Sequence, residues 1–178
     1  MIYKEEDIRE NQILEVAKSI MIAARTAPKA RGIDNLVILT ITKEDIIKLS
    51  EKTKKMYEET NQAFFLRDSQ TILNAKAIVL IGTKNAPLGL NCGLCGYATC
   101  EEKIEKSNCP CVFNSHDLGI AIGSATSIGA DNRVDNRVMY SVGAAAKELG
   151  FFGPDIVFGF AIPLSVSSKS PFFDRPTL

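Results

Sequence analysis

Five cysteines lie in one short segment of this 178-residue chain, and their spacing points to metal chemistry. Cys92, Cys95 and Cys100 are followed by Cys109 and Cys111, and the rest of the sequence has no cysteine. Thiolates bind soft metals strongly, and a loop that brings four of them together can hold a tetrahedral zinc ion or an iron-sulfur cluster. An odd number of closely spaced cysteines is poorly explained by disulfides. We therefore predict a metal site in this segment.

The spacing alone leaves the metal open. A C-x2-C-x4-C run followed by C-x-C differs from both common ferredoxin spacings and from the paired C-x2-C knuckles of zinc ribbons. Gly93 and Gly96 each follow a cysteine, where a residue without a Cβ can adopt positive φ and turn its backbone N–H toward a cluster sulfur. We expect an iron-sulfur cluster, with structural zinc as the alternative metal.

The composition is that of an ordinary globular protein. Hydrophobic residues make up 46% of the chain and charged residues 24%, and the 21 acidic residues balance the 21 basic ones. This balance argues against a broad electrostatic surface for nucleic acid or for an anionic membrane. The acidic N-terminus lacks an apolar signal core, and no uncharged stretch is long enough to span a bilayer. We expect a cytoplasmic protein that has neither nucleic acid nor membrane as a partner.

Apolar periodicity predicts helices and strands along the whole chain. We expect helices at 8–27, from a cap at Thr42 to Met56, through 64–72, from a cap at Asp117 to Ala130, and at 135–149. Continuous apolar, β-branched runs predict strands buried on both faces at 36–41, 77–82 and 155–163. Helices alternating with buried strands favour an α/β or α+β sandwich on a central sheet. We expect one domain, 1–178, with an inserted cysteine loop at 90–112.

The run 92–100 resembles the CG-x-CG-x-x-x-C opening of a 4Fe-4S module in the B subunit of the Rnf-type electron-transport complex and in corrinoid iron-sulfur proteins. The fourth cysteine of that module precedes a proline, as Cys109 precedes Pro110 here, but the interval before it is shorter in this chain. The resemblance implies a 4Fe-4S cluster held by the first three cysteines and by either Cys109 or Cys111. We favour Cys111, which is nearer the helix expected after the loop.

Segments outside the cysteine loop resemble the FMN-dependent nitroreductase-like proteins. The turn 25–30, Arg-Thr-Ala-Pro-Lys-Ala, is similar to their Arg-x-Ser/Ala-Pro-Ser flavin-binding turn, with Lys29 in place of the usual serine. The helix from Asp117 and the strand end at 159–163 correspond to two of their later landmarks. Together with the cysteine loop, these segments make the chain resemble an uncharacterised ferredoxin-domain-containing family of bacteria and archaea, which has no settled reaction.

That resemblance implies an α+β, nitroreductase-like sandwich that forms a homodimer with FMN at the subunit interface. The implied FMN contacts are Arg25, Thr26, Ala27 and Lys29 in the turn and Lys169 and Arg175 in the tail. A phosphate dianion needs charge-assisted donors, which arginine supplies in a planar fork. The plainer interpretation of Arg25 and Lys29 is that their charges complement the dipole at the end of the first helix.

The resemblance further implies a redox protein in which FMN exchanges hydride or electrons with a small substrate and the cluster passes single electrons to or from the flavin. We find no nucleophile and base constellation and no G-x-G-x-x-G dinucleotide fingerprint, so catalytic residues stay unassigned. His116, the only histidine, favours a local polar role beside the expected helix cap. The alternative is a non-catalytic iron-sulfur electron carrier or a zinc-stapled interaction module. Besides a second copy of the chain, the partner we expect is a small-molecule substrate or a redox partner protein.

Overall fold

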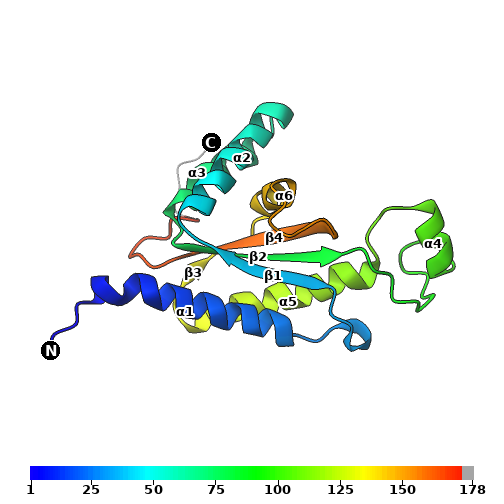
Figure 1. Ribbon diagram of the computed structural model, residues 1–178, viewed down its shortest axis with the longest axis horizontal. Helices are drawn as coiled ribbons and strands as arrows, with labels where there is room; N and C mark the ends of the chain where they lie inside the picture. Colours follow the sequence, from blue (N-terminus) through cyan, green and yellow to red (C-terminus); the bar gives the residue numbers. More distant parts are fainter. Residues whose placement is uncertain (174–178) are drawn as a thin grey trace.

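A computed structural model describes residues 1–173 and arranges them in three layers around one antiparallel sheet (Figure 1). The strand order across the sheet is β1-β2-β4-β3, and each neighbouring pair is antiparallel. The strands are β1 (Leu36–Ile41), β2 (Ala77–Lys84), β3 (Asp135–Asn136) and β4 (Ile156–Ser165). The α+β class expected from the sequence is confirmed.

Helices cover both faces of the sheet (Figure 1). One face is covered by α1 (Glu5–Thr26) and α5 (Val112–Asp131), which run side by side. The other face is covered by α2 (Glu44–Thr60), α3 (Ala63–Thr71) and α6 (Tyr140–Glu148). Three short elements complete the fold, namely the 3-10 turns η1 (Ala30–Gly32) and η2 (Ile72–Asn74) and the helix α4 (Cys100–Lys106). Among residues 1–173, no helix combines the length and the apolar character needed to cross a membrane.

The central strand β2 divides the hydrophobic core into two clusters. Ile78 and Leu80 face the layer of α2, α3 and α6, whereas Val79 and Ile81 face the layer of α1 and α5. All four side chains are fully buried, because successive side chains of a strand point to opposite faces and both faces are covered here. Burying an aliphatic side chain of this size contributes about 1.5–3 kcal/mol relative to leaving it exposed.

A glycine pair lets α6 approach the sheet closely. A Cβ on Gly143 of α6 would lie 2.1 Å from the carbonyl oxygen of Gly159 in β4, so any side chain there would push the helix away. Met139, which precedes α6, also pairs with Ala161 of β4 as an isolated bridge. These contacts hold α6 against the face of the sheet opposite to α1 and α5. That face carries no candidate site residue.

Some sequence-based expectations about the elements are wrong. The strand 36–41 has the predicted bounds, but residues 37–40 are only partly buried because β1 is an edge strand. Lys43, not Thr42, is the N-cap of α2. The helix expected from Asp117 begins five residues earlier, at Val112, and its N-cap is Cys111, the last cysteine of the loop. The helix expected from Asp135 begins at Tyr140, because residues 135 and 136 pair with β4 as β3.

Candidate functional site

The cysteine loop projects beyond one end of the sheet, where β2 ends (Figure 1). Its first part reverses direction repeatedly, with positive φ at Gly89, Asn91, Gly93 and Gly96. The expectation of positive φ at the two glycines that follow cysteines is therefore confirmed. The N–H of Gly96 donates to the carbonyl of Gly93 at 2.9 Å, and the side-chain oxygen of Asn91 accepts from the N–H of Cys100 at 2.8 Å. These bonds fold the run 91–100 into a compact ring.

Four of the five cysteines line one small hollow inside this ring. They are Cys92, Cys95, Cys100 and Cys111. Cys109 is exposed and is not among the residues that line the hollow. Cys111 is buried and is also the N-cap of α5, so its position is tied to the covered face of the sheet. The structure thus brings together the set that includes Cys111, and which cysteines bind a metal stays a prediction.

The donor set fits an iron-sulfur cluster in kind and number, but the hollow is tight. Its volume is about 10 Å³, roughly the minimum needed to hold one water molecule. Among residues 1–173, no three His, Cys, Asp or Glu side chains converge closely enough to hold a single metal ion. A zinc ion holds its sulfur ligands about 2.3 Å from one centre. A 4Fe-4S cluster is larger than a single ion, so its four thiolates lie further apart. The loop must widen to accept a cluster.

The helix α4 begins at Cys100 and is capped at its start by Thr99. The hydroxyl of Thr99 accepts from the N–H of Glu102 at 3.1 Å, and the Glu102 carboxylate accepts from the N–H of Ala98 at 3.0 Å. A hydrogen bond from Lys106, followed by the bond from the Ala98 backbone, lowers the pKa of Glu102. This cap holds Cys100 at the beginning of a helix.

One residue of α4 that the sequence analysis did not single out also lines the hollow. Lys103 is only 2% exposed, and its ammonium donates to the side-chain oxygen of Asn85 at 2.8 Å. The available signal was its position three residues after Cys100, which places both on the same side of a helix. Lysine is almost always exposed, so the sequence alone gives no reason to expect it inside.

The segment 25–30 continues into η1, and the two together are called the turn 25–32. This turn lies at the same end of the sheet, and Lys29 in it is bound by the chain itself. The ammonium of Lys29 donates to the carbonyl oxygens of Ala24, Arg25 and Ala27 at 2.7–2.8 Å. Partial burial lowers the pKa of Lys29. Lys29 therefore caps the C-terminal end of α1 with all three of its N–H donors. This agrees with the interpretation that its charge complements the dipole at the end of the helix.

Arg25 is engaged with the segment that enters β1. Its guanidinium donates to the Asp34 carboxylate at 2.5 Å and to the Leu36 carbonyl at 3.1 Å. Partial burial acts to raise the pKa of Asp34, but the hydrogen bonds from Arg25 and from the Leu36 backbone outweigh it, so that the pKa is lowered. The Arg25 side chain remains 46% exposed and can still meet a ligand.

The other residues implied as flavin contacts are not gathered around Arg25. The Thr26 hydroxyl donates to the carbonyls of its own helix, and Ala27 is buried. Lys169 follows β4 at the end of the sheet opposite to the turn, as the antiparallel registers require. Arg175 lies outside the described residues.

Three hydrogen bonds join the turn, the base of the cysteine loop and α5. Arg31, in a left-handed conformation, donates to the Leu88 carbonyl at 2.7 Å. On α5, the buried Asp117 accepts from the N–H of Ala30 at 3.0 Å, and the buried Asn114 accepts at 2.8 Å from a backbone N–H of the segment that leads into the loop. The two candidate cofactor regions are therefore parts of one connected unit.

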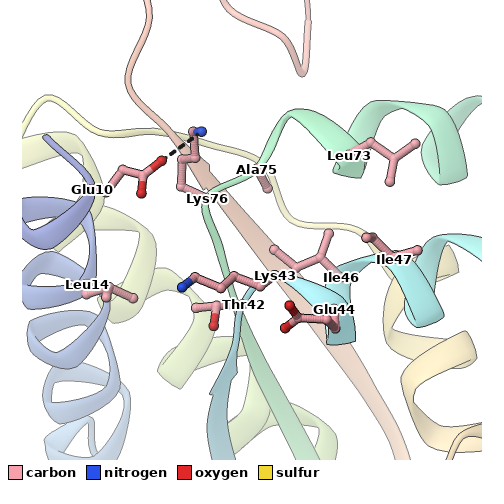
Figure 2. A pocket seen from close by; sticks show the side chains of 10 residues that line it. All are labelled: Glu10, Leu14, Thr42, Lys43, Glu44, Ile46, Ile47, Leu73, Ala75 and Lys76. Carbon is pink, nitrogen blue, oxygen red and sulfur yellow. Dashed lines mark hydrogen bonds and ion pairs between the residues drawn. The ribbon is translucent and has the colours of Figure 1, made fainter. Parts of the chain in front are cut away.

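A larger cavity lies at the other end of the sheet, away from both regions. Its volume is about 360 Å³, and it is bordered by α1, the start of α2 and the segment before β2 (Figure 2). Glu10 and Lys76 form an ion pair of 3.0 Å at its rim. No cysteine and no residue of the turn 25–32 lines it, so we do not assign it to the candidate site.

Two comparisons with known proteins show the family of this chain. Residues 107–175, which include Cys109 and Cys111, match a family described as uncharacterized proteins containing a ferredoxin domain. An uncharacterized protein from Archaeoglobus fulgidus is 40% identical over 184 residues, which cover 98% of this chain and 98% of that protein. The chain belongs to this ferredoxin-domain family. The family expected from the sequence is thereby confirmed.

Solved structures share the fold of this ferredoxin-domain protein at low sequence identity. A nitroreductase with bound FMN from Desulfitobacterium hafniense has a TM-score of 0.61 and 13% identity, over 87% of this chain and 78% of that chain. A putative nitroreductase in complex with FMN from Desulfovibrio desulfuricans has a TM-score of 0.59 and 14% identity, over 92% and 80%. A BluB-like flavoprotein from Clostridium difficile has a TM-score of 0.56 and 20% identity, over 100% and 86%. The protein has the nitroreductase-like fold that the sequence led us to expect.

Proposed function

We propose that this protein is a redox protein that carries a 4Fe-4S cluster in the cysteine loop and binds FMN at the turn 25–32. The observation that carries the proposal is that four cysteines line one hollow, in a loop that the hydrogen bond from Arg31 to the Leu88 carbonyl joins to that turn. The ferredoxin domain of the family and the FMN bound by solved proteins of the same fold support the pairing of cofactors.

The four cysteines that line the hollow would ligate the cluster. A bound cluster supplies single electrons at a potential that the surrounding protein sets. Gly93 and Gly96 let the backbone reverse tightly around the thiols, because a Cβ would strain their positive φ. Cys111 would anchor the cluster to α5, and its burial would keep water away from that side.

The turn 25–32 would hold the FMN phosphate mainly through Arg25. The Arg25 side chain is 46% exposed, so its guanidinium can add charge-assisted hydrogen bonds to those it already makes with the chain. Lys29 would add positive charge and keep the turn closed against α1. Within one chain, Lys169 follows β4 at the end of the sheet opposite to the turn. It would therefore reach this phosphate only from a second copy of the chain.

A homodimer is part of the proposal, because exposed apolar and small residues lie on α1 and α5. Ile22 on α1 is 64% exposed and Ile120 on α5 is 36% exposed. Gly119 and Gly123 have open space where a Cβ would be, so a second backbone can approach α5 closely. We expect two chains in sedimentation experiments. A monomer at micromolar concentration that still binds flavin would contradict this arrangement.

A second candidate is a non-catalytic iron-sulfur electron carrier, and one observation favours it. Lys29 and Arg25 already bind carbonyls and a carboxylate of the chain, as a purely structural turn would. Under this alternative the cysteine loop would exchange electrons with a partner protein, and the fold would serve only as its support. A zinc ion in the loop would turn the protein into a stapled interaction module.

Protein purified without oxygen distinguishes these possibilities. The proposal predicts about four iron and four sulfide per chain, a broad cluster absorption, and binding of FMN at micromolar concentration with a change in flavin fluorescence. Stoichiometric zinc without acid-labile sulfide would refute the cluster. A full cluster with no binding at tens of micromolar FMN would leave the electron carrier as the function.

A further inference from the structure

Lys103 combines deep burial with the absence of a carboxylate partner. It is among the largest fully buried side chains of the protein. Within residues 1–173, the partner of its ammonium is the neutral amide oxygen of Asn85, at 2.8 Å. An ammonium removed from water is costly unless an anion or several good acceptors replace the lost hydration. Nothing in the described chain supplies that anion.

The hollow that Lys103 lines contains the groups that can supply it. Cys92, Cys95, Cys100 and Cys111 line the same space, and they must lose their protons to bind a metal. Four thiolates outweigh the positive charge of a zinc ion or of a 4Fe-4S core, so the assembled centre is an anion. Lys103 lines the same hollow as these thiols, so its charge can serve as a counter-charge to such a centre.

Two features distinguish Lys103 from the other lysine at the end of α4. Lys106 is exposed and forms an ion pair with Glu102, so that water and a carboxylate already satisfy its charge. Lys103 is instead held by Asn85, which directly follows β2. Its ammonium is thus fixed relative to the sheet as well as to the helix that begins at Cys100.

We propose that Lys103 is the built-in counter-charge of the metal-thiolate centre and that it raises the reduction potential of the cluster. This inference rests on the proposed cluster. Reduction adds one electron, and hence one negative charge, to the centre while no bond of the protein breaks. A fixed positive charge nearby stabilises the reduced form more than the oxidised form. Lys103 is a positioning and tuning residue in this scheme, not a ligand.

The direct test is a potentiometric titration of cluster-loaded protein, with wild type compared with Lys103→Met. The expected result is at least a tenfold fall in the ratio of reduced to oxidised cluster at a fixed potential, equivalent to a shift of about 59 mV for a one-electron couple. The matched control is Lys106→Met, which should change the ratio far less because that charge is exposed and screened.

A second variant keeps the lysine and cancels its charge. Asn85→Asp is nearly isosteric and places a carboxylate against the ammonium, so the potential should also fall. Unchanged potentials in both Lys103→Met and Asn85→Asp, with iron and sulfide intact, would overturn the inference and leave the proposed function standing. Wild-type protein without iron or sulfide would instead overturn the proposed function.

A stability measurement tests the counter-charge without electron transfer. In metal-free protein, Lys103→Met should be at least as resistant to urea as wild type, because the variant removes a charge that no anion compensates. In metal-loaded protein, the same variant should lose iron, or zinc if that is the metal, several-fold faster to a chelator. A lysine that only fills space would give losses in both forms, and that result would contradict the proposal.

Discussion

The cysteine loop and the turn 25–32 lie at the same end of the sheet, but their candidate ligands are in opposite states. All five cysteines are free thiols, and four of them share one hollow. Lys29 and Arg25, in contrast, are bound to carbonyls and to Asp34. A cofactor in the loop would meet ligands that have little else to bind, whereas a phosphate at the turn would meet cations that already bind the chain.

The two regions also differ in what keeps them folded. Between residues 90 and 111, only Lys103 and Cys111 are buried, so the loop has no hydrophobic core of its own. The turn is fixed by hydrogen bonds to α1, to β1 and to Asp117 of α5. Metal binding and folding are coupled where ligands lack other support. We infer that the loop depends on its metal for rigidity and that the turn does not depend on flavin.

The largest effect that this comparison predicts is a difference between two cysteine variants. Cys111→Ser should abolish most cluster binding, because the thiol lies in the hollow at the start of α5. Cys109→Ser, the matched control, should keep most of the iron and sulfide, because Cys109 is exposed outside the hollow. Iron and sulfide per chain after anaerobic purification measure both. The reverse pattern would show that the loop rearranges to use Cys109.

The next effect concerns flavin at the turn. Arg25→Ala removes charge-assisted hydrogen bonds worth about 1.5–3 kcal/mol each, so the affinity for FMN should fall about tenfold or more. Titration with FMN followed by flavin fluorescence measures the change. Iron content should stay unchanged, because Arg25 makes no hydrogen bond to the cysteine loop. An unchanged FMN affinity would reject this phosphate site even if the protein binds flavin.

A smaller effect tests the connection between the two regions. Asn114→Ala leaves the partly buried backbone N–H of Ala86 without its acceptor, which should cost about 1 kcal/mol of unfolding free energy. The exposed Asn108→Ala should change stability by less than about 0.5 kcal/mol. Urea unfolding of metal-free protein compares them. Equal stability of the two variants would mean that the base of the loop is not held by α5.

The parts of the fold that the sequence predicts well are those with a simple period. The strand at 36–41 has its predicted bounds, and β2 extends the predicted 77–82 by two residues. Proline and glycine commonly follow the end of a helix, and α1 and α6 end two residues before Pro28 and Gly150. These features follow from local rules for backbone conformation and apolar spacing, which need no knowledge of the partner segments.

The parts of the fold and of the site that the sequence predicts poorly depend on contacts between distant segments. Asp117 looks like a helix cap, but it is an interior residue of α5 that accepts from Ala30, 87 residues earlier in the chain. Lys103 looks like a solvated charge, and only the folded loop places it beside the cysteines. Lys169 and Arg25 are grouped by family resemblance, whereas the antiparallel register separates Lys169 from the turn.

The smallest expected effect is an acid dependence of stability confined to the turn. The hydrogen bond from Arg25 lowers the pKa of Asp34 below its usual value of 3.8 in spite of partial burial. A carboxylate whose pKa is lower in the folded state stabilises that state above its ordinary pKa, and this contribution is lost as the pH falls through the folded pKa. The ion pair is partly exposed, so its contribution at neutral pH should be at most about 1 kcal/mol.

The measurement is the difference in unfolding free energy between wild type and Arg25→Ala in urea, taken at several pH values. The difference should be constant from pH 7 to about pH 5 and should shrink below about pH 4, as Asp34 becomes protonated and the pair is lost in wild type as well. In an Asp34→Asn background, Arg25→Ala should have the same effect at every pH. A difference that persists unchanged in strong acid would mean that Arg25 stabilises the turn through the Leu36 carbonyl alone, and that Asp34 does not compete with a bound phosphate for the guanidinium.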